Sequence, residues 1–374
     1  MKRISQILLI NLLMFTLVFS QAPNGSKSLL HLQTGRTFDE GRFEIRSDLN
    51  FFTKLAENAA NLNPASFKAA NYWLVNSGLA LSYGITDNFD LTVAPGIYQD
   101  THTSNEYNLP DDIRVALKAG SFDFAERKMY GAFGIGIKFP VGEDHNYPFT
   151  YYSSGAIEYG INGALSYYVD PYLPDRSLSL HLNLGWWNHN EAGKEVWKKL
   201  TSNVNSQELQ YGVGALYPTE MFDFMLELTG AHFLTQPEKF VFGREDWMYI
   251  TPTVRYKPLG WVNFNFGIDI LASGSKDESV GLPVFENIGL PNYSKWKAHI
   301  GIELTILPIT AGSMSSSQIQ RNQFNQRVEF FQKIIEEREK SENIKEELDK
   351  LKEERESAEK ELEELKQILE EEGN

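Results

Sequence analysis

Strict alternation of apolar and polar residues runs through about twelve stretches between Gly41 and Leu307, and it constrains the fold more than any other feature of the chain. In residues 178–186, leucines and a tryptophan occupy every second position, with Ser, His, Asn and Gly between them. A period of two places each set on its own face of a β-strand. The stretches are about 11–13 residues long, whereas strands of soluble proteins usually have about 5–6.

Strand length decides between a soluble sandwich and a membrane barrel. A soluble β-sandwich also has strands with one apolar and one polar face. About 9–11 tilted residues cross the hydrocarbon layer, and these strands are long enough to do so. Beyond the N-terminal region no stretch of about 18 uninterrupted apolar residues predicts a transmembrane helix. We therefore predict an all-β transmembrane fold, an antiparallel up-and-down barrel of about 12 strands, because a closed barrel pairs every backbone polar group within the bilayer.

The connections between these strands also alternate, one long and one short. Examples of long connections are 54–70, 189–205 and 273–294, and the short ones include 86–88, 219–220 and 258–260. Bacterial barrels have short periplasmic turns and long outer loops, so both ends of the barrel are expected in the periplasm. The expected strands are 42–53, 71–84, 88–99, 111–121, 128–140, 156–169, 177–188, 206–218, 221–233, 246–258, 261–272 and 295–307.

Two bands of aromatic residues test this register. Amphipathic rings prefer the headgroup layer, and outer-membrane barrels carry them at both interfaces. The outer band is expected to contain Phe51, Trp73, Tyr98, Phe139, Trp186, Trp187, Trp247 and Trp296, and the periplasmic band Tyr83, Tyr130, Tyr167, Tyr217, Phe222, Tyr256 and Trp261. The alternative is that Trp and Tyr are simply good strand formers.

The remaining chain divides into four expected segments. Residues 1–20 have the form of a secretory signal peptide, with Lys2 and Arg3 before an apolar run and a small residue, Ser20, after it. Residues 21–40 are a pre-strand or plug segment, because counting the strand-like residues 28–36 as strand one would put the long loops in the periplasm. The barrel is expected over 41–309. A polar linker, 310–326, then leads to a charged helix over 327–374.

A heptad pattern marks the end of the C-terminal helix. Its expected seam is Ile344, Leu348, Leu351, Leu362, Leu365 and Leu369, which predicts a coiled coil and self-association. A solitary helix held by Glu–Lys pairs is the alternative. At about 1.5 Å per residue the helix would be on the order of 70 Å long, enough to tether the barrel to the cell wall or to a periplasmic partner.

The polar faces of the strands carry charges of both signs, which are expected to line the lumen. A charged residue facing lipid costs about 2–4 kcal/mol at the midplane. One interpretation is a channel for small solutes, and the other is an ion-pair network that plugs a structural barrel. The inward set is Arg42, Glu44, Arg46, Asp48, Arg114, Lys118, Lys138, Glu158, His181, Glu208, Asp223, Glu227, Arg255, Asp269, Lys297, His299 and Glu303.

The expected last strand contains His299-Ile300-Gly301-Ile302-Glu303-Leu304-Thr305-Ile306. It resembles the assembly signal of bacterial outer-membrane β-barrels, a polar residue, a glycine and two spaced apolar residues. It departs from that pattern because a terminal aromatic is absent and a tail follows. The resemblance is to Gram-negative-type outer-membrane barrels in general, with no single family, and covers about 270 residues. It implies an outer-membrane location, contact with lipid and insertion by the barrel-assembly machinery.

Several other classes of function are disfavoured. A net charge of −15 argues against a nucleic-acid partner. The chain has no cysteine, which excludes thiolate metal sites and disulfides. An outer-membrane lipid hydrolase would need a histidine-activated serine, for which His145, His189, His232, Ser153 and Ser154 are weak candidates without a nucleophile elbow. Loop pairs Asp111–Asp112 and Glu143–Asp144 offer oxygen ligands to calcium, but such pairs usually face solvent. We expect no enzymatic activity, cofactor or metal.

Overall fold

The computed structural model describes residues 25–57, 69–101, 112–142, 145–146, 149–171, 173–197, 200–273 and 293–307, with 337–338, 340, 344–345, 349–350 and 352–353. The chain divides into two compact units, Met1–Gly312 and Ser313–Asn374.

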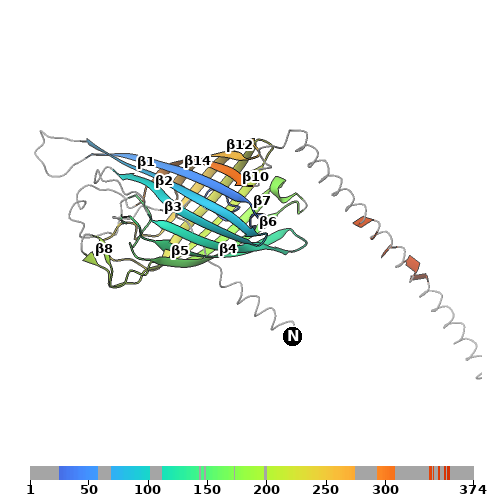
Figure 1. The fold of residues 1–374 in the computed structure, drawn as a ribbon, viewed down its shortest axis with the longest axis horizontal. Coiled ribbons are helices and arrows are strands. Elements are labelled where there is room, and N and C mark those ends of the chain that lie inside the picture. The colour runs from blue at the N-terminus through green and yellow to red at the C-terminus, as the bar shows by residue number, and fades with distance from the viewer. Residues whose placement is uncertain are drawn as a thin grey trace, which may run out of the picture. The chain divides into compact units, whose positions relative to one another are not determined.

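The first unit is a closed antiparallel barrel of twelve strands, as the alternation predicts (Figure 1). Each strand pairs with its neighbour along the chain, and β1 closes the barrel against β14. The strands are β1 (Phe43–Glu57), β2 (Ala69–Thr86), β3 (Phe89–Thr101), β4 (Ile113–Phe124), β5 (Met129–Phe139), β6 (Glu158–Tyr168), β7 (Ser179–Asn188), β10 (Gln207–Pro218), β11 (Phe222–Thr235), β12 (Trp247–Leu259), β13 (Val262–Leu271) and β14 (Trp296–Leu307).

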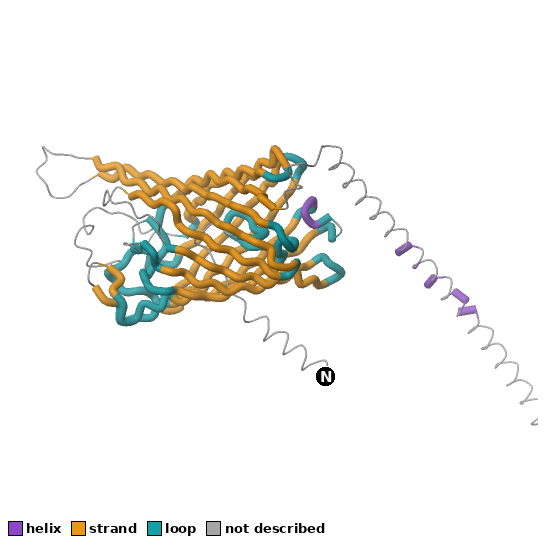
Figure 2. The backbone as a smooth tube through the Cα atoms, in the orientation of Figure 1, coloured by secondary structure: helices purple, strands orange, loops and turns teal. Residues whose placement is uncertain are grey.

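The two ends of the barrel differ in the lengths of their connections (Figure 2). We call the end with the short connections the turn end; the barrel begins at β1 and finishes at β14 on this side. One turn-end connection, between β6 and β7, carries the 3₁₀ turn η1 (Pro174–Arg176). The opposite loop end carries the long connections. The loop after β7 contains a small hairpin of β8 (Glu195–Trp197) and β9 (Leu200–Thr201), which the sequence did not predict.

The outer face of the barrel is apolar and the inner face is polar. In β7, Leu180 and Leu182 are each 50% exposed, whereas Ser179, His181 and Asn183 between them are buried. Outward leucines, isoleucines and phenylalanines in a barrel form the band that faces lipid. Separately, among the described residues no helix is long and apolar enough to cross a membrane.

The rims bear exposed aromatic side chains, with two corrections to the expected bands. Exposed rings at strand ends are Phe51, Phe139, Tyr83, Tyr167, Tyr217, Phe222 and Trp261. Trp187 and Trp247 are instead buried, each with 1% of its surface exposed. Trp187 follows the outward Trp186 in the same strand, so alternation turns its ring inward, where its Nε1 donates to Glu158 at 2.6 Å. These two buried rings are therefore not part of the exposed outer band in which the sequence places them.

The second unit is described only at a few positions, all helical and exposed. Ile344, the first expected seam residue, is 61% exposed. The other expected seam residues, Leu348, Leu351, Leu362, Leu365 and Leu369, lie outside the described residues, as do the expected signal peptide 1–20 and the expected linker 310–326.

Candidate functional site

The charged residues expected in the lumen lie on the inner face of the barrel. The Arg255 and Arg42 side chains are 12% and 30% exposed. Buried members of the set are Glu44, Arg46, Asp48, Arg114, Lys118, Lys138, Glu158, His181, Glu208, Asp223, Glu227, Asp269, Lys297, His299 and Glu303.

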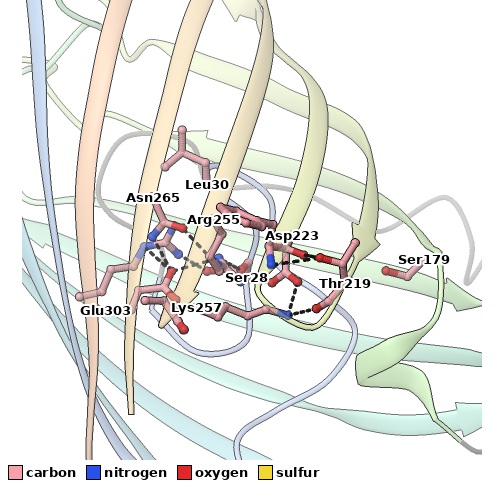
Figure 3. A network of polar contacts seen from close by, with 12 residues as sticks. Ser28, Leu30, Ser179, Thr219, Asp223, Arg255, Lys257, Asn265 and Glu303 are labelled. Atoms are coloured by element: carbon pink, nitrogen blue, oxygen red, sulfur yellow. Dashed lines mark hydrogen bonds and ion pairs between the residues drawn. The ribbon is translucent and has the colours of Figure 1, made fainter. Parts of the chain in front are cut away.

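Closure of β1 against β14 brings the two ends of the barrel sequence together. Arg46 pairs with Glu303 in the register, and its Nε lies 3.4 Å from Glu303 Oε1. Arg255 Nη2 and Asn265 Nδ2 donate to the same carboxylate oxygen at 3.0 and 2.9 Å. Figure 3 shows this network, and beside it the pair of Lys257 with the Asp223 carboxylate. Charges of opposite sign are thus paired along the wall, which limits the cost of burying them.

The N-terminal segment, residues 25–41, lies within the barrel against this wall. Its residues Lys27–Thr34 form a hairpin, closed by Thr34 N donating to Lys27 O at 3.0 Å and Leu29 N to Leu32 O at 2.8 Å. The segment is joined to the turn end, where Gly41 N donates to Gly84 O at 2.9 Å. Residues 28–36, which look strand-like in sequence, form a single antiparallel bridge, Ser28 with Gln33, and add no strand to the barrel.

A single wall carboxylate, that of Glu227, binds the tip of the hairpin. The backbone N–H groups of Leu30, His31 and Leu32 donate to its two oxygens at 2.9, 2.9 and 2.8 Å. Consecutive N–H groups that converge in this way form an anion-binding concavity. Glu227 has 0% of its surface exposed, so these bonds satisfy a charge that burial would otherwise leave unsolvated.

Glycines on the wall provide the space that the apolar tip fills. A Cβ on Gly212 would lie 2.4 Å from Leu32 Cδ2, and one on Gly267 would lie 2.9 Å from Leu30 Cδ2. A Cβ on Gly214 would lie 2.8 Å from Leu32 Cδ1. The wall is therefore shaped to the leucines of the hairpin.

The two legs of the segment are held by polar side chains from several strands. Asn183 accepts from Gln33 N at 2.8 Å and donates to Gln33 O at 2.7 Å, so its amide replaces a strand partner. Asp90 accepts from Phe38 N at 3.0 Å. Arg36 Nη1 lies 2.5 Å from Asp175 Oδ1 in η1. Burial lowers the pKa of Arg36, but the Asp175 carboxylate outweighs burial and the net shift is upward.

At the loop end, a second charged network surrounds Glu158. Lys138 Nζ lies 2.9 Å and His189 Nδ1 3.1 Å from Glu158 Oε2. Burial lowers the pKa of His189, but the carboxylate beside it outweighs burial and the net shift is upward. Ser154 Oγ donates to His189 O and contacts Glu158 Oε1, away from the imidazole. Ser153 bonds to Lys138 and Asp112, so these contacts do not form a serine–histidine pair.

Of the pairs considered for calcium, Asp112 is described and lies near cations. Its carboxylate is 3.5 Å from Lys138 Nζ and 2.9 Å from His145 Nδ1. Burial raises the pKa of Asp112, but Lys138 and His145 outweigh it and the net shift is downward. Asp111, Glu143 and Asp144 lie outside the described residues.

At the loop end of the barrel, side chains from loops pack against side chains from the ends of the strands. One cluster consists of Trp247, Tyr249, Tyr293 and Ala231, with Tyr151 against it. A second consists of Tyr152, Val196, Phe233 and Val241. In the described conformation, loops and the N-terminal segment therefore both contribute to the interior of the barrel.

Sequence reasoning missed most of the residues that hold the segment. Asp90, Asn183 and Ser166 occupy inward positions but are single polar residues without a motif. The hydroxyl of Ser166 accepts from Gly35 N at 2.7 Å. His31 lies on the segment itself, outside every expected strand. The signals that were present are the leucines Leu29, Leu30 and Leu32 and the inward glycines of β10 and β13, which gain meaning only once they are placed together.

The chain is similar to known proteins in structure but matches no sequence family. No protein-family model matches the chain, and no curated protein matches it. An outer membrane channel from Pseudomonas putida F1 has 8% identity, covering 72% of this chain and 97% of its own, with a TM-score of 0.43. The NanC porin has 11% identity, with 70% and 98% covered and a TM-score of 0.42.

The similar structures also include the translocator domain of the autotransporter NalP from Neisseria meningitidis. It has 10% identity, covering 71% of this chain and 89% of its own, with a TM-score of 0.39. These three are outer-membrane β-barrel proteins of different kinds. The chain thus resembles outer-membrane barrels in general and no single family among them.

Proposed function

We propose that the protein is a channel for small solutes in the bacterial outer membrane, closed in the described conformation by its own N-terminal segment. The observation that carries this proposal is the way the segment is held. Side chains of the wall bind its backbone N–H and C=O groups, as Glu227 and Asn183 do. Water can take over each of these bonds, so withdrawal of the segment leaves a hydrated lumen with its charges solvated.

The attachment of the segment supports a movable closure. Its last residues join β1 at the turn end, beside Gly84, so the hairpin can withdraw towards that end without passing through the barrel. The wall left behind carries both signs of charge, including Arg46, Glu227 and Asp269, which favours small polar solutes. The mixed charges of the wall support a pore without a strong preference for cations or anions.

The second candidate is a structural barrel with a permanently plugged lumen that links the membrane to the cell wall or to a partner. The tight fit of the leucines to Gly212 and Gly267 favours it, as does the packing of loops at the other end. Electrical recording separates the two candidates, because a permanent plug gives no current even under strong voltage. Enzymatic activity is not part of either proposal.

We expect the purified protein to behave as a heat-modifiable membrane barrel. The apolar outer band requires detergent, and the twelve-strand barrel should keep its β circular dichroism and migrate faster on gels before boiling than after. Replacing the outward Leu182 with Arg should reduce insertion by placing a charge opposite lipid, at a cost of about 2–4 kcal/mol near the midplane. Substituting Arg at the exposed loop position Asn203 is the control. Recovery of the wild type in the soluble periplasmic fraction would contradict the membrane assignment.

For the C-terminal unit we propose a periplasmic coiled coil that joins copies of the barrel or binds a partner. The apolar heptad at Ile344, Leu348, Leu351, Leu362 and Leu365 supports self-association. A peptide of residues 325–374 should become more helical as its concentration rises. Leu362→Asp should abolish association by placing a charge in the seam, while Gln367→Asp outside it should not. Sedimentation of a persistent helical monomer would leave the tail as a solitary rod or a partner-binding helix.

A further inference from the structure

Three potential metal ligands meet where the hairpin tip contacts the wall. His31 Nε2 lies 2.7 Å from Asp269 Oδ1, and His299 Nε2 lies 3.0 Å from Asp269 Oδ2. One ligand atom from each residue lies within 4.8 Å of the others. Asp269 and His299 are buried on β13 and β14, whereas His31 comes from the hairpin and its side chain is 18% exposed. The cluster thus joins the movable segment to two wall strands.

The surroundings of His299 point to a cation between it and Asp269. Its Nδ1 lies 3.0 Å from Asp48 Oδ2, so carboxylates face both nitrogens of the ring. The His299 Nε2 and Asp269 Oδ2 atoms are both buried, and neither makes a hydrogen bond within the part of the chain that the structure describes. A metal ion between them would bond to both atoms. A carboxylate behind a ligating histidine is the usual outer shell of such sites.

We propose that His31, Asp269 and His299 bind a divalent transition-metal ion, of which Zn²⁺ is the simplest representative. Two imidazole nitrogens and one carboxylate oxygen suit zinc and its late first-row neighbours, whereas calcium and magnesium prefer oxygen alone. In a tetrahedral zinc site the ligand atoms are about 3.3 Å apart. The contacts of His31 and His299 to the two oxygens of Asp269 would open by about 0.6 and 0.3 Å, and a separation of up to 4.8 Å within the cluster would close towards about 3.3 Å, with water as the fourth ligand.

Lys297 is the group that competes with a metal at this place. Its Nζ lies 3.3 Å from Asp269 Oδ2. The same ammonium lies 3.0 Å from the Tyr151 hydroxyl and 4.3 and 4.7 Å from the ring centroids of Tyr151 and Tyr249. These aromatic partners hold the lysine when the carboxylate turns to the metal. Lysine and metal therefore have separate partners available.

A metal ion at this site would hold the N-terminal segment against the wall. A metal bound to one hairpin residue and two wall residues exists only while the hairpin is seated, so its binding free energy stabilises the seated state. This inference goes beyond the proposed channel function, because the metal can be measured on a barrel that never conducts.

The test is isothermal titration of Zn²⁺ into the full-length protein, purified in detergent and stripped with EDTA. We expect one ion per barrel, loss of that binding in His31→Ala, and weakening of about 10- to 100-fold in Asp48→Asn, which removes the outer-shell carboxylate. His232→Ala is the matched control, because this exposed histidine near the end of β11 is not part of the cluster and pairs with Asp246 at 2.5 Å. It should bind zinc as the wild type does.

His31 belongs to the hairpin and not to a strand, so its substitution should leave the barrel folded, which heat modifiability verifies. X-ray absorption at the zinc edge should show two imidazole ligands in the wild type and one or none in His31→Ala. A wild type without zinc binding, or a His31→Ala protein that binds zinc as tightly as the wild type, would overturn the proposal.

Discussion

Deletion of residues 21–40 should convert an electrically silent barrel into one that conducts in discrete steps. The deletion removes the hairpin and both of its legs but keeps β1, which begins at Phe43. The exposed wall then presents Arg46, Asp269 and other charges to water, and a water-filled lumen carries ions. Planar-bilayer recording with the purified protein measures this, and the deletion variant should show stepwise current in salt at voltages where the wild type shows rare openings or none.

The control for this experiment is truncation after residue 309, which removes the second unit and keeps the N-terminal segment. It should remain as silent as the wild type if the segment alone closes the lumen. Circular dichroism and heat modifiability verify that both variants form barrels. Silence of a correctly folded deletion variant would favour the structural, tethering barrel, because the loop end would then be closed on its own. The substrate class can next be approached by liposome uptake of sugars, amino acids and aromatic acids through the deleted form.

Glu227→Ala should release the hairpin without removing any part of it. Three backbone N–H groups lose their acceptor at once, those of Leu30, His31 and Leu32. Hydrogen bonds to charged groups contribute about 1.5–3 kcal/mol each, but bonds to one carboxylate are not additive, so we expect a loss of about 2–4 kcal/mol in the seated state. At about 1.4 kcal/mol per factor of ten, the equilibrium shifts towards the open state by about 30- to 700-fold.

Two measurements follow this release. Single-channel recording should show a higher open fraction, and trypsin should cleave more rapidly at Lys27 and Arg36, since both lie on the segment. Glu227→Gln should have a smaller effect because one acceptor oxygen remains. Leu226→Ala is the matched control: Leu226 is the outward neighbour, 55% exposed, and its loss should leave the segment in place. If Glu227→Ala is as closed and as protected as the wild type, the carboxylate does not hold the hairpin.

The alternation of residues was sufficient to determine the strands and their closure. In β13, Phe266, Ile268 and Ile270 alternate with Gly267 and Asp269, and a period of two admits only one assignment of faces. The lengths of the connections then set the strand order, because neighbours along the chain pair in an up-and-down barrel. Closure of an up-and-down barrel also puts the last strand beside the first, and the register pairs Glu303 with Arg46 and His299 with Asn50.

The sequence could not determine what occupies the lumen. The bonds from Glu227 to Leu30 span almost two hundred positions, and neither residue has a local pattern that identifies the other. In the sequence alone, Gly212 is a residue with low strand propensity. Its role is evident only in the structure, where Leu32 packs against it. The direction in which a strand side chain points follows from the backbone periodicity of a few neighbouring residues. The contacts between the N-terminal segment and the wall depend on closure of the whole barrel. The sequence by itself determined the barrel and its polar interior, and only the tertiary structure decided that the N-terminal segment fills it.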